Sequence, residues 1–226
     1  NVRTSDTLSP HAANHSGPGF YYAGQAISYA ASITDKPVVL CSQSGCTHSD
    51  NSCNAYIGDT RQFAEYQGQW YALVKDADSE YTLMGMDSIT RERRTLGHWK
   101  AEENEHIQVS FHLLSHGYGY VTVIRETYDP QTHTYHPQPD ENIRISLSTG
   151  EKQVLAVEGD ITAASENYVF TVDRTYDENQ LGHNPVYAAL REYNLTDGTC
   201  RVVSDTADGF RPTADPNTTY GDLLIW

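Results

Sequence analysis

Three of the four cysteines and one histidine lie within thirteen consecutive positions, between two apolar segments. Cys41, Cys46, His48 and Cys53 follow the spacing C-x4-C-x-H-x4-C. Structural zinc is held by four tetrahedral nitrogen and sulfur donors, and a short loop can supply all four. These residues are therefore candidate ligands of a structural zinc ion, although the spacing is not that of a common zinc finger.

Disulfide bonds are the alternative use of the same residues. Cys46 and Cys53 could close a small loop, and Cys41 could pair with Cys53 or with the distant Cys200. Four cysteines allow three complete pairings, and the sequence does not choose among them. The absence of a Cys-x-x-Cys motif argues against a redox-active pair. Zinc ligation, disulfides and free thiols therefore all remain open.

A repeat of about 49 residues organises the rest of the chain. Aromatic-led apolar segments recur at intervals of 49, 49 and 48 residues, measured from Tyr22, Tyr71, Tyr120 and Tyr168. The turn dipeptides Thr149-Gly150 and Asp197-Gly198 are also 48 residues apart. Four short strands in each such unit are typical of a β-propeller blade, which must stack on its neighbours to bury both faces. A β-sandwich with evenly spaced hairpins is the alternative fold.

The repeat predicts an all-β fold of four-stranded blades of about 48–50 residues. Residues 1–19 are rich in Ser, Pro, Gly, Asn and His, and we expect them to form a flexible leader. The predicted blades are 20–53, 54–100, 101–158, 159–208 and a partial blade at 209–226. Because the pattern begins and stops inside a unit, we expect a partial or truncated ring.

Charge and hydropathy exclude several classes of function. The formal net charge is −15, which repels phosphate backbones and anionic membrane surfaces, so nucleic-acid binding is not expected. No apolar run reaches the length of a transmembrane helix. Few lysines, many Asp, Asn, Thr and Tyr residues and the clustered cysteines favour an exported protein.

Two further groups of side chains are candidates for binding. His112 and His116 are four residues apart, so on an inner strand they would share the face that lines a central channel. Several aromatic residues near turns or strand ends could stack on sugars or anchor a protein partner, or could instead fill the gaps between blades. They are Tyr66, Trp70, Trp99, Tyr118, Tyr128 and Tyr176. No catalytic motif accompanies them, so we assign no catalytic residue.

The cysteine segment also resembles a known group of proteins. Leu40-Cys41, Cys46-Thr47-His48 and Cys53-Asn54-Ala55-Tyr56 resemble a segment of exported bacterial β-propeller lipoproteins, which are similar to the TolB-like six-bladed propellers. The resemblance implies an extracellular or cell-envelope location and a binding role. It also implies a lipid anchor outside this chain, because the lipidated N-terminal cysteine is not in this sequence.

The sequence therefore favours an extracellular or envelope-associated binding propeller that recognises a protein or a glycan. The alternative function is a secreted carbohydrate-active hydrolase with carboxylates at the mouth of the channel. Convergent carboxylates in a deep channel would favour the hydrolase, because glycoside hydrolysis uses two of them. An aromatic-lined face would favour binding.

Overall fold

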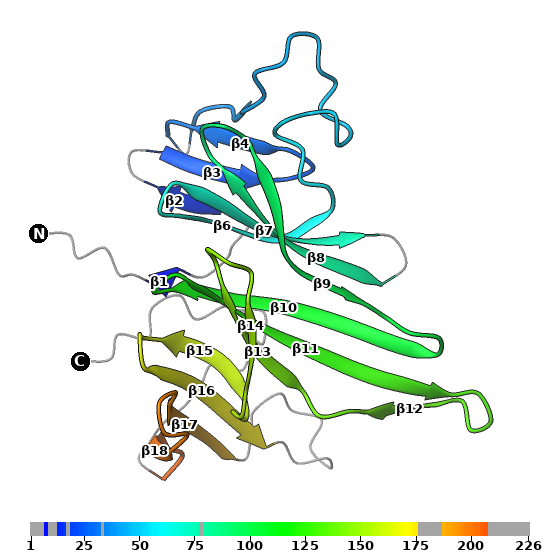
Figure 1. The fold of residues 1–226 in the computed structure, drawn as a ribbon, viewed down its shortest axis with the longest axis vertical. Coiled ribbons are helices and arrows are strands. Elements are labelled where there is room, and N and C mark those ends of the chain that lie inside the picture. The colour runs from blue at the N-terminus through cyan, green and yellow to red at the C-terminus, as the bar shows by residue number, and fades with distance from the viewer. Residues whose placement is uncertain are drawn as a thin grey trace, which may run out of the picture.

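The fold consists of four antiparallel sheets that follow one another along the chain (Figure 1). The computed structural model describes residues 7–8, 13–16, 19–32, 34–76, 79–175 and 187–207. These residues form strands, turns and irregular segments, and no helix occurs among them. The described part of the chain accordingly has no helix that could cross a membrane. The all-β prediction is confirmed, whereas the number of blades and the closure of a ring remain predictions.

Each sheet is built on a meander of four strands in chain order, with one further short strand inserted along the chain in the third sheet. The first contains β2 (Ala13–Ser16), β3 (Gly19–Ala23), β4 (Ile27–Ala30) and β5 (Val38–Val39). The second contains β6 (Thr60–Tyr66), β7 (Gln69–Asp76), β8 (Glu80–Asp87) and β9 (Arg93–Lys100). The third contains β10 (Glu105–Ser115), β11 (Tyr118–Asp129), β13 (Glu141–Ser146) and β14 (Lys152–Leu155). The fourth contains β15 (Asp160–Ala164), β16 (Tyr168–Thr175), β17 (Tyr187–Asn194) and β18 (Cys200–Asp205).

Two short strands extend the third sheet. β1 (Thr7–Leu8) pairs with β10, and β12 (Thr134–Pro137) pairs with the far end of β11. β1 and β2 both lie in the segment 1–19, which the sequence predicted to be a flexible leader, so that prediction is wrong for these residues. Edge strands pair through backbone N–H and C=O groups, and a polar segment can therefore join a sheet without an apolar pattern.

Apolar side chains fill the space between successive sheets. Alternate residues of a strand point to opposite faces, so Phe63 packs toward the first sheet while its neighbour Ala64 packs toward the third. On β7, Ala72 likewise packs toward the first sheet and Leu73 toward the third. A third core joins the third sheet to the fourth and includes Leu113, Tyr120, Leu155, Ile161 and Val169. Each inner sheet is therefore buried on both faces, as stacked blades require.

This packing corrects part of the aromatic prediction. Tyr66, Trp70 and Trp99 are only 4%, 2% and 6% exposed. Trp70 lies in the core between the first two sheets, and Trp99 in the core between the second and third. The two tryptophans are therefore not exposed binding residues. Wide rings fill the gap between facing sheets better than aliphatic side chains, which explains their position.

A side-chain amide joins the second sheet to the third. Gln62 on β6 donates from Nε2 to the Phe111 carbonyl at 2.8 Å, and its Oε1 accepts from the Phe111 N–H at 2.6 Å. Phe111 lies beside an irregularity in the β10–β11 pairing, between Phe111 and Leu113. Gln62 thus satisfies two backbone groups next to a β-bulge.

We expect Gln62→Leu to lower the free energy of unfolding by about 2 kcal/mol, because it leaves two backbone groups of Phe111 without their partner. Denaturant unfolding of the two proteins would measure the difference. Gln131→Leu is the matched control, since Gln131 is exposed in the turn before β12. Equal midpoints for Gln62→Leu and Gln131→Leu would contradict the assigned role of the amide.

Candidate metal centre and ligand pocket

The loop between β5 and β6 brings three thiols and an imidazole together. The ligand atoms of Cys41, Cys46, His48 and Cys53 all lie within 4.8 Å of one another. Cys53 is 1% exposed, and the other three side chains are partly buried. In a tetrahedral site with zinc–sulfur bonds of about 2.3 Å, neighbouring sulfurs are roughly 3.8 Å apart. The donor types and their spacing therefore fit a metal ion, and this group could hold one.

Local backbone geometry folds the loop around this point. Gly45 and His48 adopt left-handed φ angles of 72° and 58°, which reverse the chain on either side of Cys46. A turn then closes at Cys53, whose N–H donates to the Asp50 carbonyl at 3.0 Å. The Asp50 carboxylate accepts from the Ser52 N–H at 2.8 Å in the same turn. The short polar residues between the ligands thus form the turns that bring them together.

Hydrogen bonds at this site favour the thiolate form of Cys41. The Gln43 N–H donates to Cys41 Sγ and the Ala55 N–H to Cys53 Sγ, both at 3.4 Å. Burial raises the pKa of Cys41, but these contacts from Gln43, Cys53 and Cys46 outweigh it and hold the pKa below its ordinary value. His48 lowers the pKa of Cys46 through its backbone, yet burial and the two neighbouring thiols raise it overall. Of these two thiols, Cys41 therefore loses its proton more readily, and a bound cation would stabilise the thiolate.

The loop is also fastened to the second sheet. Arg93 on β9 donates from Nη2 to the Cys53 carbonyl at 2.6 Å and from Nη1 to Asn51 Oδ1 at 3.4 Å. Within the loop, Asn54 Nδ2 donates to Ser42 Oγ at 2.6 Å. Such contacts around the ligands fix their orientation, as the outer shell of a metal site does.

All four cysteines are free thiols in the structure. Cys200, a possible partner for a long-range disulfide, is exposed on β18 of the fourth sheet, opposite Tyr193 in register. It is not part of the Cys–His group. The structure thus brings together the four clustered residues and leaves Cys200 apart from them.

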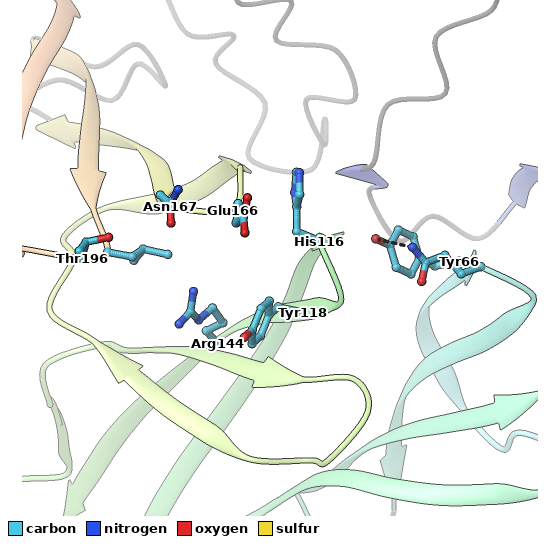
Figure 2. A pocket seen from close by; sticks show the side chains of 9 residues that line it. Tyr66, His116, Tyr118, Arg144, Glu166, Asn167 and Thr196 are labelled. Atoms are coloured by element: carbon cyan, nitrogen blue, oxygen red, sulfur yellow. Dashed lines mark hydrogen bonds between the residues drawn. The ribbon is translucent and has the colours of Figure 1, made fainter.

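A polar pocket of about 680 Å³ lies where turns of the second, third and fourth sheets meet (Figure 2). Three of its lining residues occupy equivalent first turns of these sheets, at Gln67, His116 and Glu166, which are 49 and 50 residues apart. The remaining lining residues are Tyr66, Tyr118, Arg144, Asn167, Leu195 and Thr196. The repeat of the sequence therefore reappears in space as three equivalent turns that line one cavity.

Backbone geometry and hydrogen bonds hold these turns in place. The turns Gln67-Gly68 and His116-Gly117 have positive φ at both residues, as the tightest hairpins require. Tyr66 Oη accepts from the Gly117 N–H and from Gln67 Nε2, both at 3.3 Å, which links the second and third sheets. The Leu195 N–H donates to the Asn167 carbonyl at 2.8 Å within the fourth sheet. The pocket is therefore formed before any ligand binds.

Arg144 and Tyr118 form the floor of this pocket (Figure 2). The guanidinium carbon of Arg144 lies 4.4 Å from the ring centroid of Tyr118, which is a cation–π contact. Arg144 Nη2 also donates to Gln153 Oε1 at 2.6 Å. Figure 2 shows Glu166, Asn167 and Thr196 on the side of the pocket toward which the guanidinium points. The floor thus presents an aromatic face and a fixed cation to the cavity.

The two histidines predicted to face a channel lie in different surroundings. His116 is exposed and lines the pocket, and its Nδ1 lies 2.7 Å from Ser115 Oγ. His112 lies at the β10 bulge, where its Nε2 is 2.7 Å from Thr122 Oγ1. Thr122 in turn donates to Asn142 Oδ1 at 2.6 Å. His112 is therefore not among the residues that line this pocket, and it belongs to a hydrogen-bonded chain across β10, β11 and β13.

The remaining aromatic candidates also lie in different parts of the structure. Tyr118 lines the pocket, as does the largely buried Tyr66. Tyr128 lies at the β11–β12 hairpin, 5.1 Å from the ring of Tyr135, far along the strand from the pocket turns (Figure 1). Tyr176 lies outside the described residues.

The sequence alone did not single out Arg144, Glu166, Asn167 or Thr196. For Glu166 and Asn167 a signal exists, because the repeat aligns their turn with His116 and Gln67. Arg144 has no such signal. It lies at the middle of a strand whose alternating residues Ile143 and Ile145 are buried, so its sequence context resembles that of any solvent-facing strand residue.

Comparison with known proteins gives weak likenesses. No protein-family model matches the sequence, and no curated protein is similar to it. Among solved structures, a variant of the AtxE2 isopeptidase with astexin3-dC4 bound has a TM-score of 0.38 and 11% identity, over 82% of this chain and 25% of that one. An exo-1,5-alpha-L-arabinanase from a bovine ruminal metagenomic library has a TM-score of 0.29 and 11% identity, over 89% of this chain and 81% of that one. An oligogalacturonate lyase in complex with manganese has a TM-score of 0.28 and 9% identity, over 85% of this chain and 64% of that one. The chain thus spans about a quarter of the isopeptidase.

Proposed function

We propose that the chain is part of an extracellular or envelope-associated bacterial β-propeller that binds a glycan in the pocket floored by Arg144 and Tyr118. Four successive meanders with cores between them support the propeller arrangement, because blades of this kind pack face to face. The resemblance of the cysteine segment to exported lipoproteins supports the location and an anchor outside this chain.

In this proposal the Cys–His group holds a structural zinc ion. Three thiolates and one imidazole leave no open position for a substrate once a tetrahedral ion is bound. The loop is also fastened to the second sheet through Arg93, so the ion would hold the first and second sheets together and would take no part in ligand binding.

The composition of the pocket is the observation that carries glycan binding. Sugars present hydroxyl groups on their edges and apolar C–H groups on their faces, and they bind where side-chain hydrogen-bonding groups surround an aromatic ring. Tyr118 supplies the ring, and Asn167, Thr196 and Gln67 supply amide and hydroxyl groups. A volume of about 680 Å³ falls within the range for small-ligand sites. A flat protein partner would leave this cavity unfilled.

The number of carboxylates in the pocket favours binding over hydrolysis. Glycoside hydrolysis requires two carboxyl groups that flank the scissile bond. Glu166 is the only carboxylate among the described residues that line the pocket. The alternative, a secreted carbohydrate-active hydrolase, therefore lacks its second group at this site.

Glycan arrays followed by calorimetry with the recovered oligosaccharides would test this function. We expect Tyr118→Ala to weaken binding by roughly tenfold, which corresponds to about 1.4 kcal/mol for loss of the stacking face. Tyr135→Ala is the matched control, because Tyr135 is a 57% exposed tyrosine on the β11–β12 hairpin. Chromatography of the same mixtures would detect cleavage. Equal losses in the two variants, or turnover of the glycan, would contradict the proposal.

A further inference from the structure

Arg144 differs from the other arginines on the strands of the third and fourth sheets in having no carboxylate partner. Each of the others forms an ion pair: Arg125 with Glu105 at 2.7 Å, Arg191 with Asp173 at 3.2 Å, Arg201 with Glu192 at 2.7 Å, and Arg174 with Asp160. Within the described part of the chain, no ion pair involves Arg144. A guanidinium without an anion is notable in a chain of net charge −15, where acidic groups outnumber basic ones by 30 to 15.

Neutral groups hold this guanidinium in position. The Tyr118 ring covers one face at 4.4 Å, and Gln153 Oε1 accepts from Nη2 at 2.6 Å. Arg144 lies opposite Tyr120 on the paired strands β13 and β11, and the guanidinium opposes the rise that burial causes in the pKa of Tyr120. Arg144 Nε is buried and has no hydrogen-bond partner. The cation is therefore fixed by packing and one hydrogen bond, and among the described residues no carboxylate pairs with it.

We propose that the pocket selects sugars that carry a carboxylate, with Arg144 as the residue that determines this specificity. This inference rests on the proposed glycan binding and names its ligand class. A planar guanidinium pairs with a planar carboxylate through parallel hydrogen bonds, which are charge-assisted and directional. The ligand anion supplies the partner that the fold withholds from Arg144. Asn167 and Thr196, on the side toward which the guanidinium points, are placed for the hydroxyl groups of the same ring.

Glu166 limits the charge that the pocket accepts. Its carboxylate lines the same cavity and would repel a ligand that brings more than one negative charge close to it. A single uronate therefore suits the pocket better than a phosphate monoester, which carries nearly two charges at neutral pH. This argument also predicts the effect of Glu166→Gln, which should tighten the binding of a uronate severalfold.

Matched ligand pairs would test the inference on the metal-loaded full chain. Calorimetry would compare oligomers of galacturonate and of glucuronate with their carboxyl-reduced counterparts, which keep the linkage and ring but lack the charge. We expect the wild-type protein to bind at least one uronate oligomer tenfold or more tightly than its reduced counterpart. Arg144→Gln should remove this preference while the reduced oligomer binds as before, and Arg144→Lys should retain part of it. Arg201→Gln, on exposed β18, is the matched control and should keep the preference.

The outcomes separate the two proposals. Equal affinity for a uronate and its reduced counterpart would overturn the carboxylate inference and leave glycan binding standing. Tighter binding of a sulfated oligosaccharide, lost in Arg144→Gln, would overturn the choice of carboxylate in favour of sulfate. No binding by any oligosaccharide would overturn both. If Arg144→Gln unfolds, Glu166→Gln supplies an independent answer. Unchanged uronate affinity in that variant would show that the carboxylate of the ligand does not bind near Glu166, and would therefore contradict its placement in this pocket.

Discussion

Cys53→Ser is expected to abolish stoichiometric zinc binding and to lower the free energy of unfolding by about 4 kcal/mol at free zinc a thousandfold above the dissociation constant. Cys53 is the most buried of the four candidate ligands, at 1% exposure. Its sulfur lies 3.4 Å from His48 Nδ1, so its loss removes a thiolate and also the contact that orients the imidazole. A ligand that binds only the folded chain contributes its binding free energy directly to stability.

Elemental analysis, thiol titration and denaturant unfolding would measure this effect on the same samples. Cys200→Ser is the matched control, because it makes the same chemical change at an exposed cysteine outside the group. A chelator should destabilise the wild type and Cys200→Ser equally and leave Cys53→Ser unaffected. A purified protein without metal, whose mass rises by about two units for each bridge on reduction, would establish disulfides in place of the zinc site.

Loss of the metal ion should loosen the first sheet more than the other sheets. Arg93 reaches from β9 to the Cys53 carbonyl, and the Ile27 N–H of β4 donates to the Ala55 carbonyl at 2.9 Å, just after the last ligand. Loosening the loop would therefore release contacts to both sheets at once. Hydrogen exchange should show faster exchange in β4 and β5 on chelation, with little change in the fourth sheet.

The strands and their order follow from the sequence because both depend on local patterns. The aromatic-led apolar segments 118–123 and 168–172 fall on β11 and β16. The turn glycines Gly150 and Gly198 adopt φ of 75° and 72°, which explains why glycine recurs there at the repeat spacing. The cysteine group is equally local, since all its members lie on one loop.

What the sequence does not reveal depends on how the sheets pack. Trp70 and Tyr118 both begin aromatic segments, yet Trp70 is buried between sheets and Tyr118 lines the pocket. Their local patterns do not differ enough to separate the two roles. β12 lies within a segment of three prolines that reads as a polar loop, because backbone pairing to β11 requires no apolar pattern in the sequence. Arg144 becomes significant only because distant turns surround it and, among the described residues, no carboxylate forms an ion pair with it.

The stability of the protein is expected to fall by about 3 kcal/mol between pH 6.5 and pH 4 because of His112 alone. Burial lowers the pKa of His112 to about 4, and the charge of Asp160 only partly opposes this. In the unfolded chain the imidazole titrates near 6.5, so between these values the unfolded state binds a proton that the folded state does not. The folded state therefore loses stability as the pH falls through this interval, and none of this loss occurs above about pH 7.

The hydrogen bonds around His112 explain why it stays neutral. Asn142 Nδ2 donates to the Val157 carbonyl at 3.0 Å, so Asn142 Oδ1 must accept the Thr122 hydroxyl proton. Thr122 Oγ1 then accepts from His112 Nε2–H, which places the single proton of the neutral ring on Nε2. Thr122 and Asn142 are buried, at 7% and 2% exposure, and a second proton on His112 would bring an unpaired charge beside them.

His112→Gln should remove this part of the pH dependence, because the glutamine amide can donate to Thr122 as Nε2 does and carries no titrating proton. Chemical unfolding at several values from pH 7 to pH 4 would give the slopes for both proteins. His136→Gln, an exposed histidine on β12, is the matched control and should keep the wild-type slope. The carboxylates contribute equally to all three proteins, so the difference in slope isolates His112. Parallel curves for the wild type and His112→Gln would show that the pKa of His112 is the same in the folded and unfolded states, which would contradict the depressed pKa of the buried imidazole.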